Sequence, residues 1–207
     1  MLNYWGKSDT TVQFCEKEYV HSKYIAEYQN TLSAMMYILV GIPLIFTRIR
    51  TMGISVVLLG ISTMVMHGTM RHYGQIMDEG SMIMFSWLAL REFGMKWSRN
   101  WLYLILLFYL INSKKYWCFV SLFTSLQVFI FILASKYKVD ERRKYFIRLY
   151  LIFLLMGLCC WILDMTMCEY TPSTISLHAC WHVLTAMSIL FGGVALVIGS
   201  RSPNLQS

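Results

Sequence analysis

Apolar segments long enough to cross a bilayer recur along the chain, with only short polar connections between them. Of its 207 residues, 57% are hydrophobic and 14% are charged, and an apolar α-helix needs about 20 residues to span the hydrocarbon core. The pattern predicts an all-α protein, a seven-transmembrane helix bundle in which residues 1–207 form a single domain. The expected spans are residues 30–46, 52–70, 76–90, 100–111, 116–134, 146–163 and 175–198.

The fourth expected span, residues 100–111, is short for a bilayer crossing. Its flanking residues Arg99, Lys114 and Lys115 can extend their charged ends toward the interfaces. A six-span arrangement that merges or omits this segment is the main structural alternative. Residues 1–28 are polar and aromatic and contain no cleavable signal pattern, so the first span is expected to target the chain to the membrane itself.

The net charge of +7 is distributed unevenly between the two sets of loops that seven spans define. Loops rich in Lys and Arg lie on the cytosolic side, which predicts a lumenal or extracellular N-terminus and a cytosolic C-terminus. This explains the charge without nucleic acid as a partner. The basic run 136–148 is expected to be a cytosolic loop, with contact to anionic lipid headgroups as an alternative. The richer set contains Arg48, Arg50, Arg91, Lys96, Arg99, Lys136, Lys138, Arg142, Arg143, Lys144, Arg148 and Arg201, and the opposite set contains Lys7, Lys17, Lys23, Arg71, Lys114 and Lys115.

Two histidines, His178 and His182, are four residues apart at the start of the last apolar segment. On a helix they lie on one face, one turn apart, a spacing that suits two ligands of one zinc ion. An alternative is a pair of interfacial histidines at a helix start, because this short pattern has many false positives. The topology adds His67, near the lumenal end of the second span. Three histidines with an open fourth position form the ligand set of a hydrolytic zinc site.

A carboxylate and a hydroxyl are expected beside these histidines. Asp78 begins the third span at the same lumenal face, and Thr63 precedes His67 by four residues and shares its helix face. Asp164, at the lumenal end of the sixth span, is the chief rival as catalytic carboxylate, or it orients a zinc-bound imidazole. His72 is an alternative to His67. Solvated or interfacial roles are expected for His21, His72, Glu79 and Glu169.

Three carboxylates, Glu16, Glu18 and Glu27, lie in the polar N-terminal segment close to the lumenal membrane face. Carboxylates combined with amide and backbone oxygens form the hard-oxygen shell that calcium prefers. From the residues alone, a solvated acidic segment is the simpler interpretation.

Short motifs spread in order over nearly the whole chain resemble the alkaline ceramidase family, within the wider superfamily of seven-span hydrolases that includes the adiponectin receptors. Each motif alone is weak, but together they are specific. They are Tyr4-Trp5-Gly6, Phe14-Cys15-Glu16, Tyr24-Ile25-Ala26-Glu27 followed by Asn30-Thr31, His67 with Gln75-Ile76-Met77-Asp78-Glu79, Trp161-Ile162-Leu163-Asp164, and Leu177-His178-Ala179-Cys180-Trp181-His182.

The resemblance implies an integral-membrane zinc amidase that hydrolyses the N-acyl bond of ceramide to sphingosine and a fatty acid. It places zinc on His67, His178 and His182, makes Asp78 the general base, and has the Thr63 hydroxyl stabilise the oxyanion together with zinc. The implied partners are ceramide, related sphingolipids and membrane lipid, with no obligate protein partner, in an endoplasmic reticulum or Golgi membrane. The main alternative is a seven-span lipid receptor with a structural zinc site. A transporter is less favoured, because no internal repeat is visible.

The resemblance also implies a calcium site in the N-terminal segment, and here the chain departs from the family pattern Asp-Trp-Cys-Glu-x-Asn. Gln13 removes one carboxylate and Glu18 adds one, so the formal charge is kept while the geometry changes. A second departure lies in the zinc site, where Thr63 replaces the family's serine and adds a methyl group and a stiffer first torsion. The implied calcium ligands are Gln13, the carbonyl of Phe14, Glu16, Glu18 and Glu27.

Topology and the resemblance together predict a disulfide between Cys15 and Cys168. Both cysteines fall in lumenal polar segments, where oxidation is permitted. The bond would link the N-terminal segment to the connection that leads to His178, and two free thiols are the alternative. The cysteines within expected spans, where thiols usually pack as small apolar side chains, are Cys118, Cys159, Cys160 and Cys180.

Overall fold

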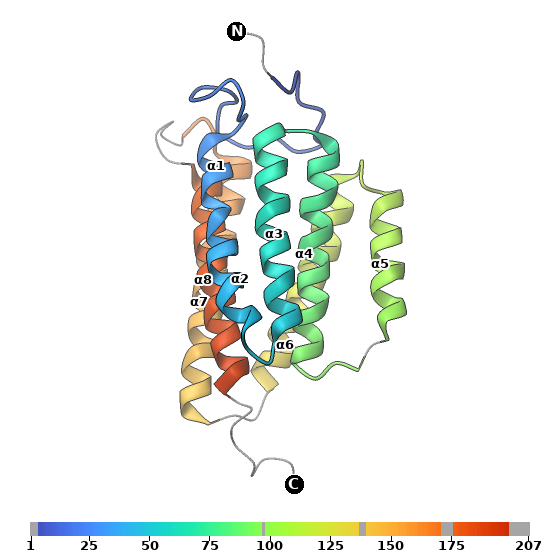
Figure 1. Cartoon of the computed structure of the whole chain (residues 1–207), viewed down its shortest axis with the longest axis vertical. Helices are drawn as coiled ribbons and strands as arrows, with labels where there is room; N and C mark the ends of the chain where they lie inside the picture. The colour runs from blue at the N-terminus through green and yellow to red at the C-terminus, as the bar shows by residue number, and fades with distance from the viewer. Residues whose placement is uncertain (1–3, 97, 137–139, 171–175, 199–207) are drawn as a thin grey trace.

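The computed structural model describes residues 4–96, 98–136, 140–170 and 176–198, and every regular element among them is an α-helix. The long helices run side by side, and the N-terminal segment lies across one end of the bundle (Figure 1). Lys138 and Arg201, two basic residues of the segments predicted to be cytosolic, lie outside the described residues. The helices are α1 (Tyr28–Ser33), α2 (Met35–Ile45), α3 (Arg50–Thr69), α4 (His72–Glu92), α5 (Arg99–Ile111), α6 (Tyr116–Lys136), α7 (Glu141–Thr166) and α8 (Leu177–Ile198).

The all-α prediction is confirmed, and each expected apolar segment overlaps a helix, the first of them overlapping the α1–α2 pair. α5 is apolar but shorter than a bilayer crossing. α4 has 21 residues and buries Gln75, Asp78 and Glu79, which makes it less apolar than its neighbours. The seven-span count and the orientation of the termini therefore stay predictions. Five segments of the described chain are long and apolar enough to cross a bilayer: Tyr28–Ile45, Arg50–Thr69, Tyr116–Ser135, Glu141–Thr166 and Leu177–Ile198.

A tight turn joins α3 to α4 and places the end of one helix beside the start of the next. Met70 ends α3 in the left-handed backbone region, with a φ of 48°, and its N–H donates to the carbonyl of Met66 at 2.7 Å. α4 then begins at His72. As a consequence, His67 near the end of α3 and Asp78 near the start of α4 lie at the same end of the bundle.

Packing between helices brings the start of α8 to this same end. α8 packs along α7 and also contacts α1 and α2, while α3 packs between α2 and α4. α6 packs against α4 on the other side. α5 lies at the edge of the bundle against α4 (Figure 1), and Tyr109 is its buried residue. The polar ends of α3, α4 and α8 consequently share one region beneath the N-terminal segment.

A disulfide bond joins Cys15 to Cys168, as predicted. The two cysteines are 153 residues apart, so the bond ties the N-terminal segment to the chain that follows α7. A disulfide that closes a long loop typically stabilises the folded chain by about 2–4 kcal/mol, mainly by constraining the unfolded chain. The remaining cysteines, all free, are Cys118, Cys159, Cys160 and Cys180.

Glycines allow α2 and α3 to approach each other closely. A Cβ atom added at Gly53 would lie 2.6 Å from the backbone nitrogen of Ile45 and 2.7 Å from the carbonyl carbon of Leu44. A Cβ atom at Gly60 would lie 2.7 Å from Cγ1 of Ile38. Because backbone atoms cannot move aside as a flexible side chain can, Gly53 is a position where the helix pair has no room for a larger residue.

We expect Gly53→Ala to lower the melting temperature of the purified protein, because overpacking a close contact costs about 1–3 kcal/mol. Gly80→Ala is the matched control, since a Cβ atom there meets nothing within 4 Å. The control should be neutral or stabilising by up to about 1 kcal/mol, because alanine is the better helix former. Equal melting temperatures for the two variants would contradict the close approach of α2 and α3.

Candidate active site

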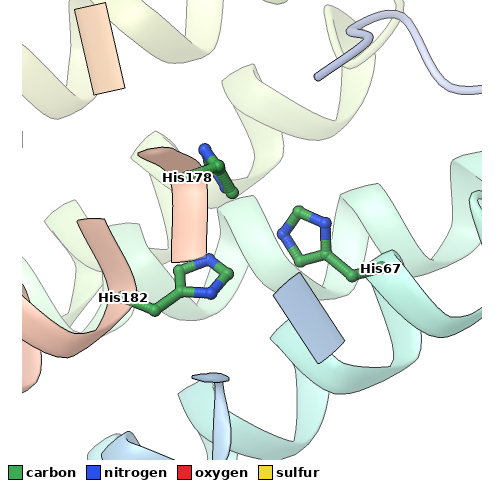
Figure 2. A group of neighbouring side chains, drawn as sticks. All are labelled: His67, His178 and His182. Carbon is green, nitrogen blue, oxygen red and sulfur yellow. The ribbon is translucent and has the colours of Figure 1, made fainter. Parts of the chain in front are cut away.

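Three buried histidines converge at the end of the bundle that the N-terminal segment covers. His67 comes from the last turn of α3, and His178 and His182 come from successive turns of α8. Their rings surround a common point (Figure 2), and one nitrogen of each lies within 4.8 Å of the others. Among the described residues, they form the one group of three His, Cys, Asp or Glu side chains that lie close enough to share an ion. The structure therefore brings together the three histidines that were predicted to converge.

The hydrogen bonds of the rings fit a shared cation. His67 Nδ1 lies 2.6 Å from a carboxylate oxygen of Glu27, and His182 Nδ1 lies 2.8 Å from the hydroxyl of Ser33. In contrast, His67 Nε2 and His178 Nδ1 are buried and have no hydrogen-bond partner among the described residues. An unpartnered buried polar atom costs about 1–3 kcal/mol, whereas metal-bound imidazoles commonly use their second nitrogen on a carboxylate. The donor set therefore suits zinc, which imidazole nitrogens bind well.

A carboxylate and a hydroxyl stand beside the histidines, on α4 and α3. The hydroxyl of Thr63 donates to Oδ1 of Asp78, and both side chains are buried. The same hydroxyl also lies 2.8 Å from the carbonyl oxygen of Leu59. A threonine has one hydroxyl proton to donate, so in this arrangement Thr63 orients Asp78.

Asp164 has a different environment from Asp78. Its side chain is fully buried, with Oδ2 accepting from the backbone N–H of Cys15 at 3.2 Å and Oδ1 accepting from that of His178 at 3.3 Å. The carboxylate therefore connects the N-terminal segment to the first turn of α8. Both bonds come from backbone N–H groups and neither from an imidazole nitrogen, so Asp164 positions the backbone here, and its two expected roles, as catalytic base or as partner of a zinc-bound imidazole, stay predictions.

An apolar cavity extends from the histidines into the bundle. Asp78, Thr63, His178 and His182 line its polar end. Along α8 the lining continues to Ile189, a rise of about 16 Å from His178 at 1.5 Å per residue. Aromatic and aliphatic side chains form most of the remaining wall, among them Phe85, Phe119, Phe123, Leu154 and Trp181. Such a space suits an amphiphile whose polar group reaches the histidines and whose hydrocarbon fills the rest.

The N-terminal segment closes the cavity above the histidines. The Phe14 ring centroid lies 3.9 Å from that of His178 and 4.9 Å from that of His67. Glu16 accepts from the backbone N–H groups of Gln29 and Asn30 at 2.7 and 2.9 Å. The segment is thereby held on α1 and on two of the histidines.

The carboxylates of the N-terminal segment gather but do not form a compact ligand group. Burial raises the pKa of Glu27 to about 8. Burial, with a smaller contribution from the charge of Glu27, also raises the pKa of Glu16 and of Glu18. Gln13 is exposed. A divalent cation would relieve the mutual repulsion of the carboxylates, so the residues suit calcium by charge, while the calcium site stays a prediction.

The expectations for three remaining polar residues have different outcomes. Glu169 is exposed, as expected, and His72 contacts Ser113 at 3.4 Å rather than joining the histidines. Glu79 was expected to be an ordinary interfacial charge, and this is wrong. Its side chain is 2% exposed, accepts hydrogen bonds from Gln75 and Tyr109, and lines the cavity. The signal that could have revealed it is the spacing of four between Gln75 and Glu79, which places two polar groups on one face of an otherwise apolar helix.

A family model described as Ceramidase matches residues 6–202. This chain belongs to the ceramidase family. An alkaline ceramidase of Arabidopsis thaliana is 26% identical over 215 residues, covering 90% of this chain and 82% of that protein. Alkaline ceramidase 1 of Mus musculus is 23% identical over 96% of this chain and 83% of its own length. An alkaline ceramidase of Drosophila melanogaster is 28% identical over 94% of this chain and 80% of its own length. The predicted family is thereby confirmed. As a member of this family, the protein is an enzyme of the hydrolase class.

We expect His178→Ala and His182→Ala each to remove most of the zinc from the purified protein, because two histidines seldom hold the ion that three hold. Metal analysis after dialysis measures the bound zinc directly. His21→Ala is the control, since His21 is exposed and lies outside the histidine group. Unchanged zinc in both α8 variants would overturn the site.

Proposed function

We propose that this ceramidase-family chain hydrolyses the N-acyl amide bond of ceramide and releases sphingosine and a free fatty acid. The observation that carries the proposal is the pairing of Asp78 with Thr63 beside three buried histidines, at the polar end of an apolar cavity. The names of the relatives support ceramide as the substrate. The apolar helices support an integral-membrane location, which we assign to the endoplasmic reticulum or the Golgi.

The side chains divide the reaction between them. Zinc held by His67, His178 and His182 would supply Lewis acidity and lower the pKa of bound water toward about 7. Asp78 accepts a proton from the water that attacks the amide carbonyl carbon, and it returns this proton to the leaving sphingosine nitrogen. The Thr63 hydroxyl orients Asp78 first and then donates to the oxyanion that develops on the carbonyl oxygen. The hydrocarbon chains fill the apolar cavity and keep water away from the reacting amide.

Release of sphingosine and fatty acid from ceramide by the purified protein tests this function. We expect activity that a zinc chelator abolishes, and Asp78→Asn should lower kcat by about 10²–10⁴-fold with zinc still bound, because a positioned base contributes about that factor. Asp164→Asn is the matched control and should lower thermal stability more than turnover. The roles of the two aspartates are reversed if Asp164→Asn abolishes turnover and Asp78→Asn does not. Ceramide binding without any product would favour the receptor alternative.

We also propose that calcium binds the N-terminal segment through Gln13, the Phe14 carbonyl, Glu16, Glu18 and Glu27. The support is that three buried or part-buried carboxylates lie in one segment, with Glu16 and Glu18 each close enough to Glu27 for their charges to interact. Glu27 also contacts His67, so an ion here would act on the position of a zinc ligand from a distance. Calcium would therefore support activity without taking part in the reaction.

Calcium is expected to raise the melting temperature of the parent protein, because a ligand that binds only the folded state stabilises it by mass action. The triple variant Glu16→Gln, Glu18→Gln, Glu27→Gln should lose this rise. Glu169→Gln, at an exposed carboxylate, should keep it. A full calcium response in the triple variant would show that the ion binds elsewhere or not at all.

A further inference from the structure

Glu79 is a buried carboxylate that faces the cavity beside Asp78 and has no part in the proposed proton transfers. Its side chain is 2% exposed, and it lines the same space as Asp78, Thr63 and the α8 histidines. An ionisable group at membrane depth is expensive and is usually functional. Glu79 follows Asp78 directly on α4, and both side chains line the same cavity.

Three separate parts of the chain fix the orientation of this carboxylate. Oε1 accepts from Gln75 Nε2 at 2.7 Å, and Oε2 accepts from the Tyr109 hydroxyl at 2.7 Å. Gln75 is in turn held by Thr11, whose backbone N–H donates to Gln75 Oε1 at 2.8 Å. The N-terminal segment, α4 and α5 thus hold one carboxylate in place before any ligand arrives.

The carboxylate keeps capacity to accept further hydrogen bonds from the cavity side. Each carboxylate oxygen has about two acceptor positions, and the described residues use one on each oxygen. No ion pair found among the described residues includes Glu79, so its charge is not taken by a lysine or an arginine. Glu79 can therefore accept a hydrogen bond from a neutral donor such as a hydroxyl group.

Ceramide carries hydroxyl groups next to its amide. Its two sphingoid-base hydroxyls sit on the two carbons bonded to the carbon that bears the amide nitrogen. With the amide at Asp78 and the histidines, these hydroxyls enter the cavity that Glu79 also lines. We propose that Glu79 accepts a hydrogen bond from a sphingoid-base hydroxyl and so selects amides that carry hydroxyls beside the reacting nitrogen. This inference rests on the proposed function.

A structural role for Glu79 makes different predictions from a binding role. If the carboxylate only anchored α5 through Tyr109, then Glu79→Gln and Tyr109→Phe would both lower stability, and neither would change the choice of substrate. If Glu79 binds the substrate, Glu79→Gln changes substrate choice strongly, whereas Tyr109→Phe removes one hydrogen bond that orients the carboxylate and changes substrate choice less.

The test compares kcat/KM for ceramide, for 1-deoxyceramide, which lacks one hydroxyl, and for an N-acyl alkylamine of the same chain length, which lacks both. The parent protein should favour ceramide over the hydroxyl-free amide by about 10²-fold or more, because a site built to bind a hydroxyl rejects analogues that lack it. Glu79→Gln should reduce this ratio at least tenfold, mainly by raising KM for ceramide. Tyr109→Phe should reduce the ratio less than Glu79→Gln does.

Two results would overturn the inference. One is a parent protein that hydrolyses all three amides with equal kcat/KM, a comparison that needs no variant to fold. The other is a Glu79→Gln variant that retains zinc and the parent ratio. In both cases ceramide is still hydrolysed, so the proposed function stands. A complete lack of ceramide hydrolysis by the zinc-loaded parent protein would overturn both proposals.

Discussion

The hydrogen bond between Glu27 and His67 connects the segment outside the membrane to the group of histidines inside the bundle. Both side chains are almost completely buried, and two backbone bonds beside them, from Ala26 to Gly68 and from Glu27 to His67, dock the same stretch on the end of α3. A buried ionisable pair is stable only with good geometry and further hydrogen bonds, and Asn30 supplies one to Glu27 at 2.9 Å. Any displacement of the N-terminal segment therefore moves His67, one of the three clustered histidines.

The N-terminal segment makes comparable contacts with every helix that contributes to the site. Thr11 bonds to Gln75 on α4, Cys15 bonds to Asp164 on α7, and Phe14 packs on His178 of α8. Some polar groups at the ends of the helices pair with one another, as Thr63 does with Asp78. The N-terminal segment supplies further partners, both backbone N–H groups and side chains, and so covers this end of the site.

The sequence was enough to predict the elements of the site that depend on topology alone. Once the apolar segments are counted, His67, Asp78 and His178 must lie at one end of the bundle, and Cys15 and Cys168 must share a compartment. The environment of Glu79 was not predictable in this way, because it depends on which residue of another helix faces it. Tyr109 lies 30 residues away, on a helix whose packing partner the pattern of apolar residues does not specify. The same limit applies to Ser33, the partner of His182, since a serine near the start of a span is ordinary.

The disulfide has a consequence for the order in which the molecule is made. Cys15 emerges from the ribosome early, but its partner Cys168 and the histidines of α8 follow only near the end of synthesis. The first span therefore inserts while the segment before it has nothing to dock on. The three histidines cannot come together until nearly the whole polypeptide is made, and a translation product that ends before Cys168 lacks both the second cysteine and two of the three histidines.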